Sequence, residues 1–478
     1  MLNTFVFLYL LMSISIGLLA TLRVKNSRDF VSAGRSLPLS IVTATMFATW
    51  FGSEAILGAP PVFIEEGIGG IVADPFGAAF CLIFAGIFFA RALYRRNLLT
   101  IGDFYRQRFG REAEVITSVA IMISYMGWVS AQFIALGVVF SSLSGGAITH
   151  EQGIMIGAAI VIFYTMFGGM WSVALTSFVQ MIIIIVSLLV IAWVVADKAG
   201  GADVVIAHAD AAGKLSGFWP EWSLASILAF VGAFVTLALG SIPQQDVFQR
   251  MNSSKNENIA VAGSVLGGVG YLVFCMVPLF ITYAAVVIDP GLVDRVMAVD
   301  TQQVLPTFMQ ADFPMILQVL FFGALLSAIM STASGTLLAP STVFTENLIK
   351  PFLGQQTDKQ FLWSLRLIVL VFGIFIAWFA IQSESSIFEM VEEAYTVTLV
   401  AAFVPLAAGV YWHRANRIGA LTSMAFGVIT WQAMNYFAAD SIWPAQLAGL
   451  LAAIIGMIVG TLLSTSGEKV LVSDQTSL

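Results

Sequence analysis

The sequence predicts an all-α integral membrane protein with about 13 transmembrane helices, and three observations support this. Of its 478 residues, 59% are hydrophobic and only 10% are charged, which is too little charge for a soluble protein of this size. Apolar stretches long enough to cross the ~30 Å hydrocarbon core of a bilayer recur along the whole chain. The basic residues fall mainly between alternate stretches, as in multi-pass membrane proteins.

Thirteen spans are expected from the apolar stretches. They lie at 2–20, 37–63, 68–93, 115–143, 150–167, 172–196, 223–241, 259–288, 312–346, 361–381, 385–411, 417–438 and 443–464. Because this number is odd, the two termini are expected on opposite sides of the membrane.

The positions of Lys and Arg predict which side each loop faces. With these spans, 18 of the 21 basic residues share one side, and only Lys198, Lys214 and Arg295 lie on the other. Basic residues favour the cytoplasmic side. We therefore expect a multi-pass protein of the cell inner (plasma) membrane with its N-terminus outside and its C-terminus in the cytoplasm. The larger set comprises Arg23, Lys25, Arg28, Arg35, Arg91, Arg95, Arg96, Arg106, Arg108, Arg111, Arg250, Lys255, Lys350, Lys359, Arg366, Arg414, Arg417 and Lys469.

Several function classes are not supported by the sequence. Cys81 and Cys275 both lie in apolar runs, which does not indicate a disulfide framework or a Cys-rich metal site. The three histidines, His150, His208 and His413, lack metal-ligand spacing. The sequence contains no GxxxxGK[ST] motif for ATP-driven pumping and no HExxH or GxSxG motif. We expect neither an enzyme nor a nucleic-acid partner.

The segment 324–336, ALLSAIMSTASGT, lies inside a long apolar run and carries several small polar residues. Ala328, Ser331 and Thr332 are spaced i, i+3 and i+4, so one helical face presents a carbonyl and two hydroxyls at membrane depth. Uncharged oxygen ligands suit a small, hard monovalent cation that must bind and then leave. The alternative is that both hydroxyls bond to their own helix backbone.

A second segment, 44–61, predicts a helix that is broken partway across the bilayer. It reads ATMFATWFGSEAILGAPP, with Gly52, Glu54 and Gly58 close to two prolines. A broken helix leaves backbone carbonyls free, which can supply the other half of an ion site. Together the two segments indicate an ion-coupled transporter.

Four motifs carry a resemblance to a known family. They are TMFATW at 45–50, GMWSV at 169–173, GSIPQQDVFQR at 240–250 and AIMST at 328–332. The chain resembles the sodium/solute symporter family, which includes proline, sugar, sialic acid and choline transporters. It is most similar to the choline-transporter-like members, and the last motif also matches the proline-transporter pattern. These motifs identify the family well and the substrate poorly.

The resemblance implies a LeuT-type core of two five-helix repeats with inverted topology and broken helices. It would place a peripheral first span and loop at 1–36, the first repeat at 37–222 and the second repeat at 223–415. Two peripheral spans and a short cytoplasmic tail would occupy 416–478. No internal repeat is visible in the sequence itself.

The resemblance also implies a sodium site and its ligands. By alignment, Ala48 and Phe51 would provide backbone oxygens from the broken helix, and Ala328, Ser331 and Thr332 would provide oxygens from the facing helix. Some family members hold a further sodium ion on an aspartate, where this chain has Ser177. Without that charge we expect one sodium ion per transport cycle, as the coupling ion.

Two tryptophans, Trp50 and Trp128, match aromatic residues that line the pocket of choline-transporter-like members. A ring face attracts a quaternary ammonium by about 0.5–2 kcal/mol per ring. The alternative for both is packing in the core or in an interfacial belt. Gln244 and Ala78 stand where that group has a Trp and a Tyr. This pocket is therefore less aromatic and richer in amides, which suits a substrate with hydrogen-bonding groups.

Intramembrane polar residues complete the expected substrate site, because such residues are rare unless they are functional. They are Glu54, Gln132, Gln244, Gln245 and Glu392. For Glu54 the alternative is a hydrogen bond to a helix end. For Glu392 it is a helix N-terminus, where acids favour the helix dipole and face water.

The sequence therefore predicts a sodium-coupled symporter that imports a small nitrogen-containing solute, such as an amino acid, a betaine or a choline-like compound, by alternating access. The alternative is a transporter-like membrane sensor or receptor that acts through a separate partner kinase. No output domain is encoded in the 478 residues, which favours transport. Expected partners are the solute, the sodium ion and membrane lipid. The oligomeric state is open, and a monomer is sufficient.

Overall fold

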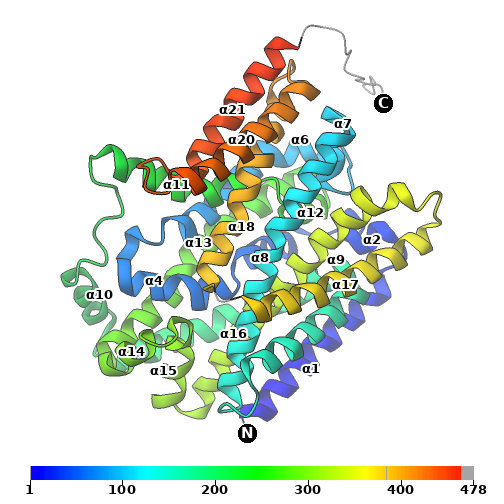
Figure 1. Cartoon of the computed structure of the whole chain (residues 1–478). Coiled ribbons are helices and arrows are strands. Elements are labelled where there is room, and N and C mark those ends of the chain that lie inside the picture. The colour runs from blue at the N-terminus through cyan, green and yellow to red at the C-terminus, as the bar shows by residue number, and fades with distance from the viewer. Residues whose placement is uncertain (1, 384, 465–478) are drawn as a thin grey trace.

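A computed structural model describes residues 2–383 and 385–464 (Figure 1). In this part of the chain every regular element is helical, and the one bridge of strand type joins Leu37 to Ser254. Lys469, one of the basic residues used for the topology, lies outside the described residues. The all-α fold class is thus confirmed.

The first half consists of α-helices, labelled α, and of short 3-10 and π-helical segments, which are both labelled η. They are α1 Leu2–Ala20, η1 Thr21–Arg23, α2 Ser27–Ser32, η2 Ala33–Arg35, α3 Leu39–Trp50, η3 Glu54–Gly58, α4 Ala59–Glu66, η4 Gly67–Gly69, η5 Val72–Gly77, α5 Ala78–Phe84, η6 Ala85–Phe89, α6 Ala90–Arg95, α7 Ile101–Phe109, α8 Arg111–Leu143, α9 His150–Lys198 and α10 Ala202–Ala211.

The second half has the same character. Its elements are α11 Leu224–Gly240, α12 Gln245–Asn252, α13 Glu257–Ile288, α14 Pro290–Met297, η7 Thr301–Gln303, α15 Val304–Asp312, α16 Met315–Val343, η8 Phe344–Ile349, η9 Lys350–Phe352, α17 Asp358–Gln382, α18 Ile387–Thr398, η10 Leu399–Phe403, α19 Val404–Tyr411, α20 Arg417–Phe437 and α21 Ala445–Leu463.

Two spans are broken by bends of similar size. The chain turns by 47° between α3 and the η3–η4 segment, and by 46° between α11 and α12. The second break contains Pro243, which has no backbone N–H to donate to a helix. The broken spans come first in 37–222 and in 223–415, the two repeats implied by the resemblance. Broken helices in corresponding positions of two halves are typical of inverted-repeat transporters. The repeat boundaries stay a prediction.

Helix α9 joins two expected spans, 150–167 and 172–196, into one 49-residue element. At 1.5 Å per residue it is roughly 70 Å long, about twice what a bilayer requires. Inside it Gly169 leaves the helical conformation, with φ 52° and ψ −143°. A side chain at Gly169 would overlap the carbonyl and ring of Phe30, so glycine permits both the kink and the close approach of α2.

The number of spans is lower than the thirteen expected when it is judged by length and composition. Among the described residues, eight helices are long and apolar enough to cross a membrane, or up to ten if each bent pair forms one span. Helix α9 counts once, and the first helix appears only as the short apolar helix Leu8–Arg23. Helix α20 contains polar residues such as Gln432 and Asn435, and it is not among the helices that are apolar enough to be counted.

The core of the molecule is built around α16, which packs against α3, α8 and α9. Helix α13 covers α3 from another side, and α18 packs against α8. Helices α20 and α21 lie together at the top of Figure 1, while α10, α14 and α15 gather at the left, far from α2. The two segments with sequence signals, α3–η3 and α16, therefore meet in the centre of the protein.

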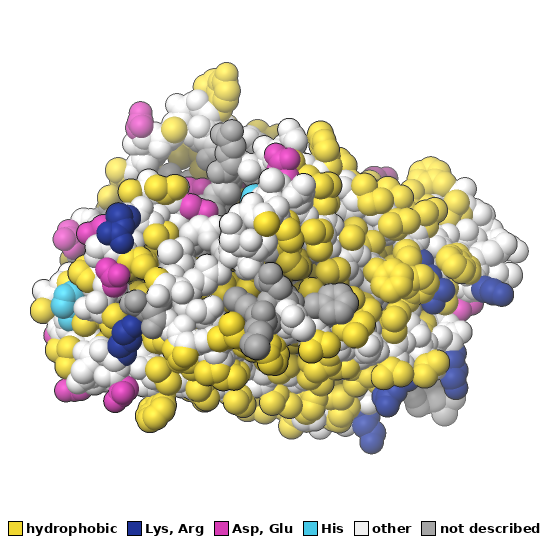
Figure 2. Space-filling view, turned by 90° about the horizontal axis from the view of Figure 1, so that it is seen from below, with side chains coloured by type: hydrophobic (Ala, Val, Ile, Leu, Met, Phe, Trp, Pro, Cys, Tyr) yellow, Lys and Arg dark blue, Asp and Glu magenta, His cyan; other side chains and the backbone are white. Residues whose placement is uncertain are grey.

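The distribution of side chains on the surface is typical of a protein embedded in a membrane. On the face shown in Figure 2, apolar side chains form a broad area between the two ends. Acidic side chains gather mostly at the left end, and most of the visible Lys and Arg lie at the right end. This distribution agrees with the charge asymmetry in the sequence, while the orientation of the termini stays a prediction.

Candidate functional site

The break in the first core span lies at 51–53. Helix α3 ends at Trp50, and Phe51 adopts φ −80° and ψ 71°, so its carbonyl no longer follows the helix. The Gly52 N–H donates to the Trp50 carbonyl at 2.9 Å. A Cβ at Gly52 would lie 2.8 Å from both Glu54 Oε2 and Thr332 Oγ1. Glycine at this position therefore lets the broken backbone approach two polar side chains from different elements.

The predicted sodium ligands occupy the contact between α3 and α16. Thr332 Oγ1 donates to the Ala48 carbonyl at 3.0 Å, a bond between segments 284 residues apart. Ala328 lies one turn earlier on α16, and it is fully buried together with Ser331 and Thr332. The structure thus brings a hydroxyl of α16 to a backbone oxygen at the break. The Thr332 hydroxyl thus bonds to a different helix, whereas the alternative was a bond to its own helix backbone.

Ser331 faces a different neighbour from Thr332. Its hydroxyl is 2.7 Å from the hydroxyl of Ser177 on α9, the position where some symporters have an aspartate. Ser334 Oγ donates to the Ser331 carbonyl at 3.0 Å. This side of α16 is therefore a chain of neutral hydroxyls without a carboxylate, which provides little compensation for a second sodium ion.

A cluster of aromatic rings lies next to the break. The rings of Trp50 and Trp128 stack with centroids 5.1 Å apart. Tyr395 of α18 meets both edge-on, at 5.1 Å and 5.2 Å, and Tyr125 stacks on Trp128 at 5.8 Å. All four side chains are buried. Tyr125 and Tyr395 were not predicted from the sequence, although Tyr125 lies three residues before Trp128 on the same helical face.

Several donors in this ring cluster have no hydrogen-bond partner within the described part of the chain. They are Trp50 Nε1, Trp128 Nε1 and Tyr395 Oη. Buried Trp and Tyr polar atoms normally find a partner. Three such donors lie around this one set of rings.

Glu54 follows the break on η3 and is bonded to Gln132 of α8. Gln132 Nε2 donates to Glu54 Oε2 at 2.9 Å, while Gln132 Oε1 accepts from the Ser53 N–H at 3.1 Å. Gln132 lies one turn from Trp128 on α8, so the carboxylate is held against the helix that carries the rings. Two sequence-predicted substrate residues, Glu54 and Gln132, are thus direct partners.

Gln244 borders the same cluster from the second break. Its Nε2 donates to Ser124 Oγ at 2.6 Å and to Thr398 Oγ1 at 3.1 Å. Ser124 precedes Tyr125, and Thr398 lies three residues after Tyr395. Gln244 therefore joins the two helices that carry the tyrosines.

Two expected substrate residues do not contact the rings. Gln245 begins α12, and its Oε1 accepts from the Ile101 N–H at 2.8 Å. It therefore anchors α7 instead of lining a pocket, because the turn after Pro243 directs the two neighbouring glutamines to different helices. Glu392 is half-buried and lines a cavity of about 440 Å³ between α4 and α18, with Glu66, Gly58 and Phe388.

A buried ion pair lies on α12, directly after the second break. Asp246 Oδ2 and Arg250 Nη1 are 3.2 Å apart, and both side chains are buried. Tyr125 Oη donates to Asp246 Oδ1 at 2.5 Å, and Arg250 Nε donates to the Thr45 carbonyl at 3.0 Å. Its place in the sequence predicts a cytoplasmic position for Arg250, but Arg250 lies inside the protein as the partner of Asp246.

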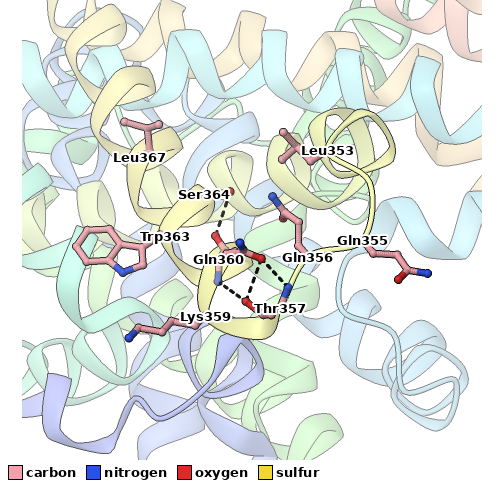
Figure 3. Close-up of a pocket in the computed structure, with 9 residues that line it drawn as sticks. All are labelled: Leu353, Gln355, Gln356, Thr357, Lys359, Gln360, Trp363, Ser364 and Leu367. Atoms are coloured by element: carbon pink, nitrogen blue, oxygen red, sulfur yellow. Dashed lines mark hydrogen bonds between the residues drawn. The ribbon is translucent and has the colours of Figure 1, made fainter.

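Another cavity, of about 610 Å³, lies far from the breaks, at the start of α17 (Figure 3). Its loop is held by the N-terminal cap of α17, where Thr357 and Gln360 bond to each other's backbone N–H. The lining residues are Leu353, Gln355, Gln356, Thr357, Lys359, Gln360, Trp363, Ser364 and Leu367. Lys359 is the one charged residue among them, and we do not assign this cavity a function.

The family model of the sodium:solute symporter family matches residues 30–427. The chain belongs to this family. The resemblance drawn from the four motifs is thereby confirmed, and the members it matches are transporters and not enzymes. Membership also agrees with a multi-pass protein of the plasma membrane.

Relatives of this symporter include transporters of two solutes. It is 28% identical over 383 residues to the human high affinity choline transporter 1, covering 77% of this chain and 65% of that protein. The match thus spans less than two thirds of the human protein's length. It is 25% identical over 485 residues to the sodium/proline symporter of Escherichia coli strain K12, covering 96% of this chain and 93% of that protein.

Solved structures confirm the LeuT-type fold of the symporter. A Na⁺-coupled sialic acid symporter in a substrate-bound outward-open state aligns with a TM-score of 0.83 at 19% identity, covering 97% of this chain and 98% of that one. MhsT in complex with L-phenylalanine aligns with a TM-score of 0.55 at 16% identity, covering 89% and 98%. At these identities the likeness concerns the fold alone.

Proposed function

We propose that this chain is a sodium-coupled symporter that imports a small nitrogen-containing solute by alternating access. One observation carries the proposal. The Ala48 carbonyl at the end of the broken α3 meets the Thr332 hydroxyl of α16, directly beside the buried rings of Trp50, Trp128 and Tyr395. An ion site and a solute site that share one broken helix are suited to coupling.

The sodium ion is proposed to bind between α3 and α16. Its ligands are the backbone oxygens of Ala48, Phe51 and Ala328 and the hydroxyls of Ser331 and Thr332. All are uncharged oxygens, which suit a hard monovalent cation that must also be released. A cation placed here takes up the two oxygens that are joined by the 3.0 Å bond between Thr332 and Ala48.

The solute is proposed to be a zwitterion, bound by the ring cluster and Glu54. Its positively charged nitrogen meets the carboxylate of Glu54 and the faces of Trp50 and Trp128. These two rings stack on each other with centroids 5.1 Å apart, so solute binding requires them to separate. The solute's own carboxylate meets the unpaired donors Trp50 Nε1, Trp128 Nε1 and Tyr395 Oη. Choline offers the nitrogen without the carboxylate. We therefore place an amino acid or a betaine-like solute ahead of choline, and both ahead of sugars.

Alternating access requires one closed and one open side. The cavity lined by Glu66 and Glu392 lies toward the predicted outer side, and the buried Asp246–Arg250 pair lies on the other side of the rings. We propose that solute enters through the cavity and leaves when the ion pair separates from Thr45. Helix α12 would then move relative to α3, as the two breaks allow.

The test of the solute class is a thermal-shift screen of the purified protein. Ligands that bind the folded state raise its apparent stability by mass action. Amino acids, betaines, choline and carboxylates are compared with and without sodium. An amino acid or betaine that stabilises only with sodium supports the proposal, whereas a sugar or a nitrogen-free acid as the best ligand contradicts the solute class.

The stoichiometry is tested by the paired flux of labelled sodium and the ligand found in the screen. Because Ser177 forms only a neutral bond to Ser331, a ratio near one is expected. A ratio near two would show that another group supplies the charge of the missing aspartate.

A further inference from the structure

An apolar groove of about 360 Å³ lies between α4, α10 and α13. Its volume is within the range of small-molecule sites, and it shares no lining residue with the proposed sodium and solute sites. We propose that this groove binds an acyl chain of a phospholipid from the surrounding membrane. The inference goes beyond the proposed symport and does not depend on it.

The lining of the groove selects for hydrocarbon. Ten of its eleven lining side chains are apolar, and the eleventh belongs to Tyr283. The Tyr283 hydroxyl is 3.1 Å from Nδ1 of His208, so it already has a hydrogen-bond partner. A polar or charged group placed in the groove would lose its water without gaining a partner, which is unfavourable. The part of a ligand that enters the groove is therefore apolar.

The groove continues the lipid-facing surface of α13, which is among the helices long and apolar enough to cross a membrane. Exposed apolar side chains follow one face of this helix at spacings of three, four and three residues. They are Leu266, Val269, Val273 and Met276, with 37–67% of their surface exposed. Met276, the last of them, lines the groove, as does Phe280 four residues later. An acyl chain that lies along this stripe of α13 therefore leads directly into the groove.

The loop after α10 indicates that the groove opens near the lipid headgroups. Trp219 and Trp222 are 76% and 100% exposed, and tryptophan is enriched where a membrane meets water. The loop is packed against the membrane-spanning body, because the ring of Trp219 lies 5.9 Å from that of Phe230 on α11. A lipid can therefore keep its headgroup at this level while one chain occupies the groove, which favours a phospholipid over a free apolar solute.

The groove also contacts the first broken span. Phe63 lines it from α4, which belongs to the half of that span after the break. The ring of Phe63 meets the ring of Tyr283 on α13 edge-on, with centroids 5.7 Å apart. A chain in the groove adds apolar contacts to both helices. The bound lipid therefore stabilises the position of α4 against α13.

The experiment uses the full chain in phosphatidylcholine liposomes that contain a phosphatidylcholine with a diazirine in the middle of one acyl chain. After illumination, mass spectrometry locates the labelled residues. Phe63, Val205 and Leu279 line the groove but are only 6%, 2% and 5% exposed, so lipid that moves along the surface does not reach them. We expect label on these three residues. Label confined to exposed residues, such as Val273 or Leu367 of α17, would overturn the proposal.

Two variants of α10 provide a matched comparison. Ile206 lines the groove and is 52% exposed, whereas Val204 is 41% exposed and does not line it. Ile206→Asp places a carboxylate beside the bound chain and should lower the label on Phe63 and Leu279 by roughly fivefold or more. Val204→Asp should leave that label unchanged. An equal loss in both variants, or no loss in Ile206→Asp, would contradict the site. The unmodified chain decides the question if a variant fails to fold.

Discussion

The two broken helices of this symporter hold buried acids in opposite ways. At the first break Glu54 and Asp74 accept hydrogen bonds from neutral groups only. At the second break Asp246 is 3.2 Å from Arg250 and accepts from Tyr125. The first break therefore leaves negative charge for a cation that comes and goes, whereas the second supplies its own cation. We infer that the first break is the binding element and the second is a closing element.

This difference predicts that changes at the second break reduce stability most. Removing one partner of a buried ion pair leaves the other charge uncompensated, at a cost of about 3–5 kcal/mol. Arg250→Met should therefore lower the melting temperature strongly. The double variant with Asp246→Leu should regain a large part, because no charge then remains buried. Equal melting temperatures for Arg250→Met and the unmodified protein would show that the pair is not a structural lock.

A change at the first break should reduce transport without a comparable loss of stability. In Gly52→Ala the new methyl would lie 2.8 Å from both Glu54 Oε2 and Thr332 Oγ1, so these side chains would have to shift. We expect uptake to fall at least tenfold, an apparent loss of about 1.4 kcal/mol. Gly270→Ala is the matched control, since its nearest contact would be 3.9 Å away. Similar uptake by both variants would contradict the role of Gly52.

The ring cluster between the breaks should show a smaller, graded effect. Trp50→Phe keeps a ring face, whereas Trp50→Ala removes it. With cation–π energies of about 0.5–2 kcal/mol per ring, solute affinity should fall more for Ala than for Phe. Trp193→Ala, on the 73% exposed Trp193 of α9, should have no effect. If Phe and Ala at position 50 weaken binding equally, the ring face does not contact the solute.

Sequence patterns predicted the first break well because its causes are local. The residues at 48–58 interrupt the helix through Gly52 and the change in direction around it, and hydroxyls at i+3 and i+4 mark the facing helix. The stack of Trp50 on Trp128 and the bond from Thr332 to Ala48 join segments that the family resemblance had already paired.

What the sequence did not reveal depends on tertiary packing. Asp74 resembles any acid near a helix end until η5 is packed against Tyr271. Arg250 looks like a cytoplasmic arginine by its position in the chain, and only the fold of α12 buries it against Thr45. Gln245 and Gln244 are adjacent, yet the turn after Pro243 directs Gln245 to α7 and Gln244 to Ser124 and Thr398. The orientation of each of these side chains depends on contacts between segments that are distant in the sequence.

The most direct test of the account is the sodium dependence of uptake in two threonine variants. Thr332 Oγ1 bonds to Ala48 across the break, whereas Thr336 Oγ1 bonds only to carbonyls of its own helix. A hydrogen bond to a charged group contributes about 1.5–3 kcal/mol, and we expect the loss of one oxygen ligand of an ion to be of the same order. Thr332→Ala should therefore raise the sodium concentration for half-maximal uptake by about tenfold or more, and Thr336→Ala should leave it nearly unchanged. Equal uptake with and without sodium, or the same shift in both variants, would contradict the sodium site proposed between α3 and α16.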